Sequence, residues 1–176
     1  MARKRRELLV LPPFCDGVGS DGNVRWRRVP TADYKTMGRI LCYHLIVEHY
    51  LETYLKTVFP HLRWETTRLT FNHKLELLSG KTSSPLVDFG LLPGLQQLNS
   101  IRNRLSHRLD AKISMDDLKP FLGALRRWSK SRRTPTTNPV LTIEHFAILV
   151  CATLGGGVWS HTSHQKSTWH QRSRHL

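Results

Sequence analysis

Leu91 to Asp110 read LLPGLQQLNSIRNRLSHRLD, and this run is the strongest guide to the fold. Its apolar residues recur every three or four positions, which is typical of a helix with one buried side. At about 100° per residue, they fall within about 60° of the direction of Leu98. These residues are Leu91, Leu95, Leu98, Ile101, Leu105 and Leu109. Because Pro93 suits the first turn of a helix, we expect a helix over residues 93–109 that packs along this apolar stripe.

Three polar residues of this helix point away from the stripe. Arg102 falls about 40° from the direction of Leu98, Asn103 about 140° and His107 about 180°. Asn103 and His107 are four residues apart, so their side chains are neighbours on the exposed side. The long stem of Arg102 lets its guanidinium reach toward that side. His107 is therefore not a core residue of this helix, and on spacing alone an ordinary surface histidine is the simplest interpretation.

Two helices are expected before this one. Apolar residues at helical spacing predict a long first helix over 33–59, which Pro60 ends. Thr66 or Thr67 is expected to cap a second helix that stops at 79–80. The stretch 81–90 is expected to be a loop.

Two further helices are expected after it. Ser114 and Asp117 have a capping-box spacing, and they open a helix that reaches Trp128. Thr142 is expected to open an apolar helix over 143–154, and the three glycines that follow are expected to end it.

Together these patterns predict an all-α protein, an antiparallel bundle of four or five helices with flexible basic ends. We expect an irregular basic arm at residues 1–30, with one short strand at Leu8–Leu11. The helical domain is expected at 31–155, with a linker near 130–139, and a basic, histidine-rich tail at 156–176. No other segment alternates with period two for long enough to build a sheet.

The excess positive charge is concentrated at the two ends of the chain. The formal net charge is +14, from 27 Lys and Arg against 13 Asp and Glu. Residues 1–30 hold 7 basic and 3 acidic residues, and residues 126–176 hold 8 and 1. Basic ends on a nearly neutral body favour binding to a polyanion such as RNA, DNA or an anionic membrane surface. A solubilising tail is the alternative interpretation.

Cysteines and apolar runs indicate a cytoplasmic protein without a metal or other cofactor. The cysteines Cys15, Cys42 and Cys151 are far apart and form no CxxC pair, so neither a thiolate zinc site nor a disulfide framework is expected. The apolar stretch at 8–11 is too short for a signal peptide. The run 146–159, interrupted by glycines, falls short of the roughly 20 residues that span a bilayer. We therefore expect no membrane contact.

The run from Leu98 to Asp110 resembles the signature helix of HEPN domains, in which an Arg, often followed by Asn, precedes a His with four to six residues between them. The segments Tyr43–Leu51 and Thr70–Leu78 resemble the first and second helices of that family. The resemblance covers about residues 35–130. The mannitol-repressor type of protein has the same kind of fold.

This resemblance implies a metal-independent endoribonuclease that acts as a homodimer on RNA, of the kind found among toxins and defence effectors. Arg102 and His107 would be catalytic and Asn103 a polar auxiliary. Arg104 and Arg108 are candidate RNA-binding neighbours. An antitoxin or regulatory protein would be a further partner. Toxins of this family that pair with a nucleotidyltransferase antitoxin often carry Tyr two residues after the His, where this chain has Leu109.

The residue types suit this chemistry. An imidazole can exchange protons near neutral pH, and a guanidinium matches phosphate oxygens in a fork. One His per chain is too few for both a base and an acid, but a two-fold dimer supplies two. A non-catalytic regulatory or interaction module with the same fold is the alternative. The sequence contains no GxxxxGK[ST], HExxH or GxSxG motif.

Two other groups of residues are candidates. Glu48 either orients a catalytic group across the bundle or belongs to a solvated polar stripe. Trp26, between Arg25 and Arg27, either stacks on a base while the arginines hold phosphates or packs on the bundle.

Overall fold

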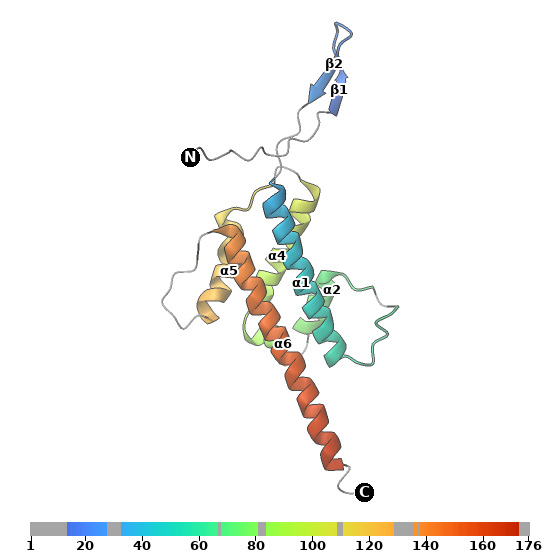
Figure 1. Ribbon diagram of the computed structural model, residues 1–176, viewed down its shortest axis with the longest axis vertical. Coiled ribbons are helices and arrows are strands. Elements are labelled where there is room, and N and C mark those ends of the chain that lie inside the picture. Colours follow the sequence, from blue (N-terminus) through green and yellow to red (C-terminus); the bar gives the residue numbers. More distant parts are fainter. Residues whose placement is uncertain are drawn as a thin grey trace, which may run out of the picture.

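The computed structural model describes residues 14–27, 33–66, 68–80, 84–108, 111–128, 136 and 138–172, and within them the chain is mostly helical (Figure 1). The strands are β1 (Phe14–Val18) and β2 (Val24–Arg27). The helices are α1 (Tyr34–Val58), α2 (Phe71–Ser79), α3 (Pro85–Asp88), α4 (Leu92–His107), α5 (Met115–Trp128) and α6 (Pro139–Arg172). The expected all-α class is confirmed at this level.

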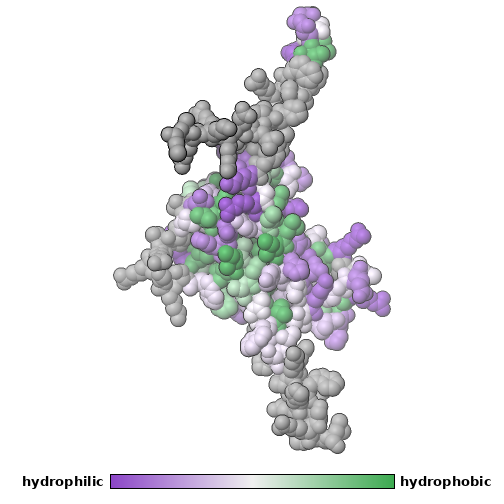
Figure 2. Space-filling model, in the orientation of Figure 1, coloured by the Kyte–Doolittle hydropathy of each residue, from purple (hydrophilic) through white to green (hydrophobic). Residues whose placement is uncertain are grey.

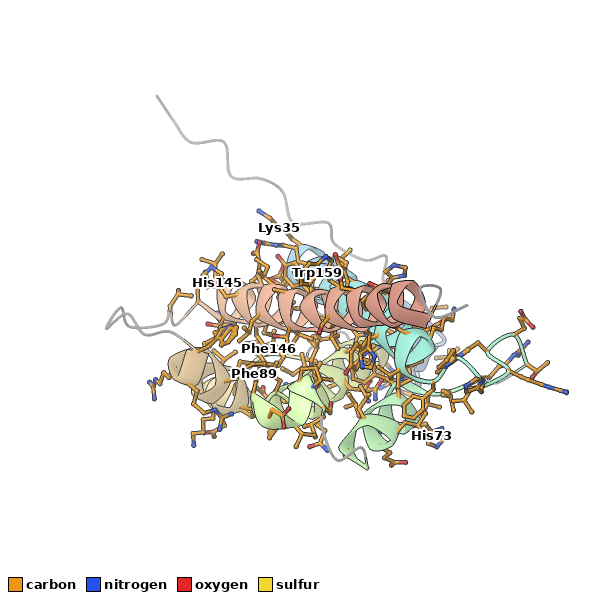
Figure 3. The ribbon with its side chains drawn as sticks, turned by 90° about the horizontal axis from the view of Figure 1, so that it is seen from below. Lys35, His73, Phe89, His145, Phe146 and Trp159 are labelled. Atoms are coloured by element: carbon orange, nitrogen blue, oxygen red, sulfur yellow. The ribbon has the colours of Figure 1, made fainter. Side chains whose placement is uncertain are left out.

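One apolar core holds the helices together. The stripe of α4 is buried as predicted, with Leu98 and Ile101 fully buried and Leu105 nearly so. Phe146 of α6 points into the body of the molecule, whereas His145 lies on the outer side of the same helix (Figure 3). The Phe146 ring packs on Phe121 of α5, with 4.9 Å between ring centroids. The long helix α6 therefore closes the core over α4 and α5.

α1 and α6 lie side by side and run in the same direction (Figure 1). Near the start of both helices Arg39 donates to Glu144, with 2.7 Å between Nη2 and Oε2. Further along both helices the rings of Tyr54 and His161 are 6.3 Å apart. The expectation of an antiparallel bundle is wrong for this pair. Short loops reverse direction between consecutive helices, and most of the chain separates these two.

The three glycines at 155–157 do not end the last helix, as the sequence predicted, because α6 continues from Pro139 to Arg172. A Cβ at Gly157 would lie only 2.7 Å from Cε2 of Tyr54. The glycine thus lets α6 approach α1 closely. The helix begins at Pro139 rather than at 143, and the side chain of Asn138 accepts from the N–H groups of Val140 and Leu141. The expected boundary between domain and tail at 155 therefore falls inside a helix.

The length of α6 also bears on whether this segment is long enough to cross a membrane. Pro139–Ser163 is long and apolar enough to cross a bilayer, by length and composition alone, and 44 % of its most apolar part is buried inside the protein. A core helix passes the same test. The prediction that no segment reaches this length was wrong, because it took the glycines as a stop.

The N-terminal arm is not irregular throughout. β1 and β2 pair antiparallel, with Phe14 opposite Arg27 and Val18 opposite Val24. Gly22 has a φ of +79°, a conformation that the tight turn requires and that glycine adopts at little cost. The hairpin stands away from the helical body (Figure 1). The strand expected at 8–11 and most of the expected linker at 130–139 lie outside the described residues.

For α5, α2 and α3, one sequence prediction is confirmed and two are wrong. Ser114 and Asp117 form the predicted capping box of α5, with 3.2 Å from the Asp117 N–H nitrogen to Ser114 Oγ. The cap of α2 is Thr70, whose hydroxyl accepts from the His73 N–H, and not Thr66 or Thr67. The expected loop at 81–90 contains α3, which forms because it buries the fully enclosed Leu86.

Candidate functional site

α4 presents the motif residues as its projection predicted. Asn103 and His107 are exposed, and His107 is the last residue of the helix. Arg102 is half-buried on the flank, and its Nη1 donates to Asn103 Oδ1 over 3.0 Å. Leu109, the last member of the predicted stripe, lies outside the described residues. The buried stripe therefore fixes the helix and leaves these three side chains on its accessible sides.

Arg102 and Asn103 line a polar hollow between α1, α2 and α4, which we call the α1–α2–α4 pocket. Its volume is about 370 Å³. The residues that line it are His44, Glu48, Thr70, Phe71, Asn72, Asn99, Arg102 and Asn103. A second hollow of about 490 Å³ shares Asn72, Asn99 and Asn103, so the two form a continuous polar surface along α2 and α4. His107 lines neither of them.

His44 is the main residue of this pocket that the sequence prediction missed. It is 3 % exposed, and its ring packs on Phe71 with 4.5 Å between centroids. Its Nε2 lies 3.2 Å from Asn99 Oδ1, and the Asn99 amide nitrogen donates to Asn72 Oδ1 over 2.9 Å. On a helical projection His44 falls about 60° from Val47, inside the buried side of α1. Applying to α1 the projection used for α4 would have identified it.

Glu48 is fixed in place across the interface of α1 and α2. Lys74 donates to Glu48 Oε1 over 2.9 Å and to Glu52 Oε2 over 3.1 Å. Burial works against the charge of Lys74, but the two carboxylates outweigh burial and raise its pKa. Glu48 Oε2 lies 3.8 Å from His44 Nδ1. Glu48 thus pairs with Lys74 of α2 and lies near His44 of its own helix, whereas its expected role of orienting a catalytic group stays a prediction.

Burial is the main influence on the pKa of His44, and it favours the neutral ring. Burial lowers the pKa of His44, with Arg102 and Lys74 acting in the same direction, and Asn99 and Glu48 oppose this only in part. A neutral imidazole has one donor nitrogen and one acceptor nitrogen.

Arg104 has a different partner from Arg102. Its guanidinium donates to both carboxylate oxygens of Asp117, over 3.1 Å and 2.5 Å. Asp117 also accepts from Gln97 and from the Ser114 N–H. Burial alone would raise the pKa of Asp117, but the hydrogen bonds from Arg104 and Ser114 outweigh it and lower the pKa. This predicted RNA-binding arginine therefore joins α4 to α5.

The other predicted RNA-binding residues lie in two separate places. Arg108 is exposed and caps the C-terminal end of α4, beside His107. Arg25, Trp26 and Arg27 belong to β2, in the hairpin that stands away from the helices (Figure 1). Arg25 and Arg108 do not line the α1–α2–α4 pocket.

A third hollow is apolar and lies between α1 and α6. Hydrophobic side chains gather on this face (Figure 2), and Ile46, Tyr50 and Ile148 remain exposed on it. Cys151 lines it, and burial raises the pKa of this thiol to about 11. A thiol is a nucleophile only as the thiolate, so Cys151 offers no nucleophile at neutral pH. The polar pocket is the better candidate for chemistry.

The described residues contain no cluster of three or more His, Cys, Asp or Glu arranged to hold a metal ion.

In comparisons with known proteins, no family profile, no curated protein and no solved structure matches the chain.

Proposed function

We propose that this chain is a metal-independent endoribonuclease of the HEPN kind, with Arg102, Asn103 and His107 as its catalytic residues. One observation carries the proposal. Arg102 and Asn103 open into a polar pocket, and His107 lies one turn further along the same accessible side of α4. Metal-free RNA cleavage requires proton transfer, which an imidazole can supply, and stabilisation of the phosphate charge, which a guanidinium can supply.

The reaction proceeds at one phosphodiester. The 2′-oxygen attacks phosphorus as a base removes its proton, the bond from phosphorus to the 5′-oxygen breaks, and an acid protonates that oxygen. The Arg102 guanidinium stabilises the added negative charge on the phosphate oxygens. His107 serves as base or acid. The product carries a 2′,3′-cyclic phosphate.

The active form in this proposal is a homodimer. Each chain has one motif imidazole, and a base and an acid are both needed. His107 is exposed at the end of α4 and lies outside the pocket of its own chain. A two-fold axis near this end brings two His107 side chains into one groove. A cognate antitoxin or regulatory protein that covers this groove would switch the activity off.

The second candidate function is a non-catalytic regulatory or interaction module of the same fold. The position of His107 favours it, because within one chain this imidazole does not line the polar pocket. Such a module would bind RNA or protein through the same face without cutting it.

One experiment separates the two. The purified full chain is incubated with total RNA in the presence of EDTA, and the RNA ends are analysed. The nuclease proposal predicts fragments that end in 2′,3′-cyclic phosphate. RNA that stays intact would overturn the nuclease proposal and favour the regulatory module.

A further inference from the structure

The inner end of the α1–α2–α4 pocket holds two hydrogen-bond acceptors that face each other. His44 Nδ1 is buried and has no hydrogen-bond partner in the part of the chain that the structure describes. Glu48 Oε2 lies 3.8 Å from it, while Lys74 occupies the other carboxylate oxygen. Buried polar atoms are nearly always paired, so an unpaired one on a residue that lines a pocket points to a place for a ligand.

The hydrogen bonds around His44 show that Nδ1 is an acceptor. The Asn99 amide nitrogen donates to Asn72, so the Asn99 oxygen faces His44 Nε2. That oxygen can only accept, and Nε2 must therefore carry the hydrogen. Burial and the nearby Arg102 and Lys74 lower the pKa of His44, which keeps Nδ1 without a proton. The group that fits between Nδ1 and Glu48 Oε2 is a donor from a ligand.

The mouth of the pocket offers hydrogen-bond donors, whereas its inner end offers acceptors. The guanidinium of Arg102 and the amides of Asn72 and Asn103 offer donors there, and Arg102 suits a phosphate. Phe71, 6 % exposed, forms an apolar wall next to His44. At about 370 Å³ the pocket falls in the size range of small-molecule sites. A ligand with a flat apolar body, a donor at one end and a phosphate at the other matches this arrangement.

We propose that the α1–α2–α4 pocket binds an RNA base by its exocyclic amino group, which bridges His44 Nδ1 and Glu48 Oε2 while Arg102 holds the adjoining phosphate. The proposal rests on the proposed function for its substrate, RNA. Cytosine presents an amino group where uracil presents a carbonyl oxygen. That oxygen would face two acceptors, so between the two pyrimidines the pocket selects cytosine and rejects uracil.

The test is a pair of titrations on the full chain with cytidine 3′-monophosphate and uridine 3′-monophosphate, followed by NMR of the His44 ring nitrogens and by calorimetry. The two bases differ at position 4, which is an amino group in cytosine and a carbonyl oxygen in uracil, and at N3, which carries a hydrogen only in uracil. We expect at least about tenfold tighter binding of the cytidine nucleotide and a shift of the His44 Nδ1 signal. Equal affinity, tighter binding of the uridine nucleotide or binding of neither would overturn the proposal.

Two matched variants locate the effect. Glu48→Gln and Glu52→Gln each remove one carboxylate from Lys74, but only Glu48 faces His44. The Gln amide nitrogen at position 48 can donate to His44 Nδ1 and occupy the place of the base. We expect Glu48→Gln to abolish the preference for cytidine and Glu52→Gln to keep it. Equal ratios in both variants would overturn the proposal.

This test is independent of cleavage. A chain that prefers the cytidine nucleotide but leaves RNA intact would contradict the nuclease proposal and keep the base site. A chain that cuts RNA without distinguishing the two nucleotides would support the nuclease proposal and overturn the base site.

Discussion

Arg102 and Arg104 are two positions apart on α4, yet their guanidinium groups meet different surroundings. Arg102 contacts Asn103 at the mouth of the pocket, whereas Arg104 is paired with the nearly buried Asp117. A guanidinium that already has a bidentate carboxylate partner is less available for a phosphate. The two residues therefore have separable roles, the first in the site and the second in stability.

Arg104→Ala should destabilise the fold, and Arg102→Ala should do so much less. Removing Arg104 leaves the Asp117 carboxylate buried without its cation, which costs about 1–3 kcal/mol once the partial exposure of the arginine is allowed for. Urea unfolding of both variants measures the difference. Equal stability of the two variants would contradict this division of roles.

The same ion pair makes stability depend on acid pH. The pKa of Asp117 is lower in the folded state than in the unfolded state. Its contribution is therefore complete above the unfolded pKa of about 3.9 and is lost as the pH falls through the folded value. Asp117→Asn should accordingly differ most from wild type near neutral pH and approach it in acid. A stability difference that stays constant with pH would show that Asp117 is not the titrating group.

At the scale of elements, the neighbouring glycines Gly156 and Gly157 of α6 should respond oppositely to alanine. A Cβ at Gly156 has open space, so Gly156→Ala should stabilise the helix by up to about 1 kcal/mol. At Gly157 the Cβ would collide with the ring of Tyr54, and Gly157→Ala should destabilise by about 1–3 kcal/mol. Thermal unfolding followed by circular dichroism measures both. Stabilisation by both substitutions would mean that α6 does not pack on α1 at this point.

These elements also show what the sequence could and could not predict. The stripe of α4 and the Ser114–Asp117 cap were predictable, because local spacing determines both. The passage of α6 through its glycines was not, because the close packing at Gly157 involves Tyr54, about a hundred residues earlier in the chain. The candidates Arg102, Asn103 and His107 come from one helix, but the pocket is also lined by His44 and Asn72 from two others. Sequence periodicity describes the faces of single helices and does not say which faces meet.

At the scale of the whole molecule, the proposed dimer makes a prediction about mixed chains. In a dimer of wild type with His107→Ala, the groove has one imidazole and lacks either the base or the acid, so this dimer should not cut RNA. When the two chains are co-expressed in equal amounts, only a quarter of the dimers carry two wild-type chains. Cleavage should therefore fall to about a quarter of the wild-type value. About half of the wild-type value would show that each His107 acts without the other, and it would contradict the shared groove.

The most direct measurement of the central claim compares wild type with His107→Ala in RNA cleavage with EDTA present. His145→Ala is the matched control, because His145 is also exposed but lies on the outer side of α6 (Figure 3). His107 is outside the core, so its loss should leave the fold intact, as circular dichroism can verify. Loss of a proton-transfer group predicts a decrease of about 10²–10⁴-fold for His107→Ala and no change for His145→Ala. Wild type that cuts no RNA, or His107→Ala that cuts it as fast as wild type, would contradict the claim.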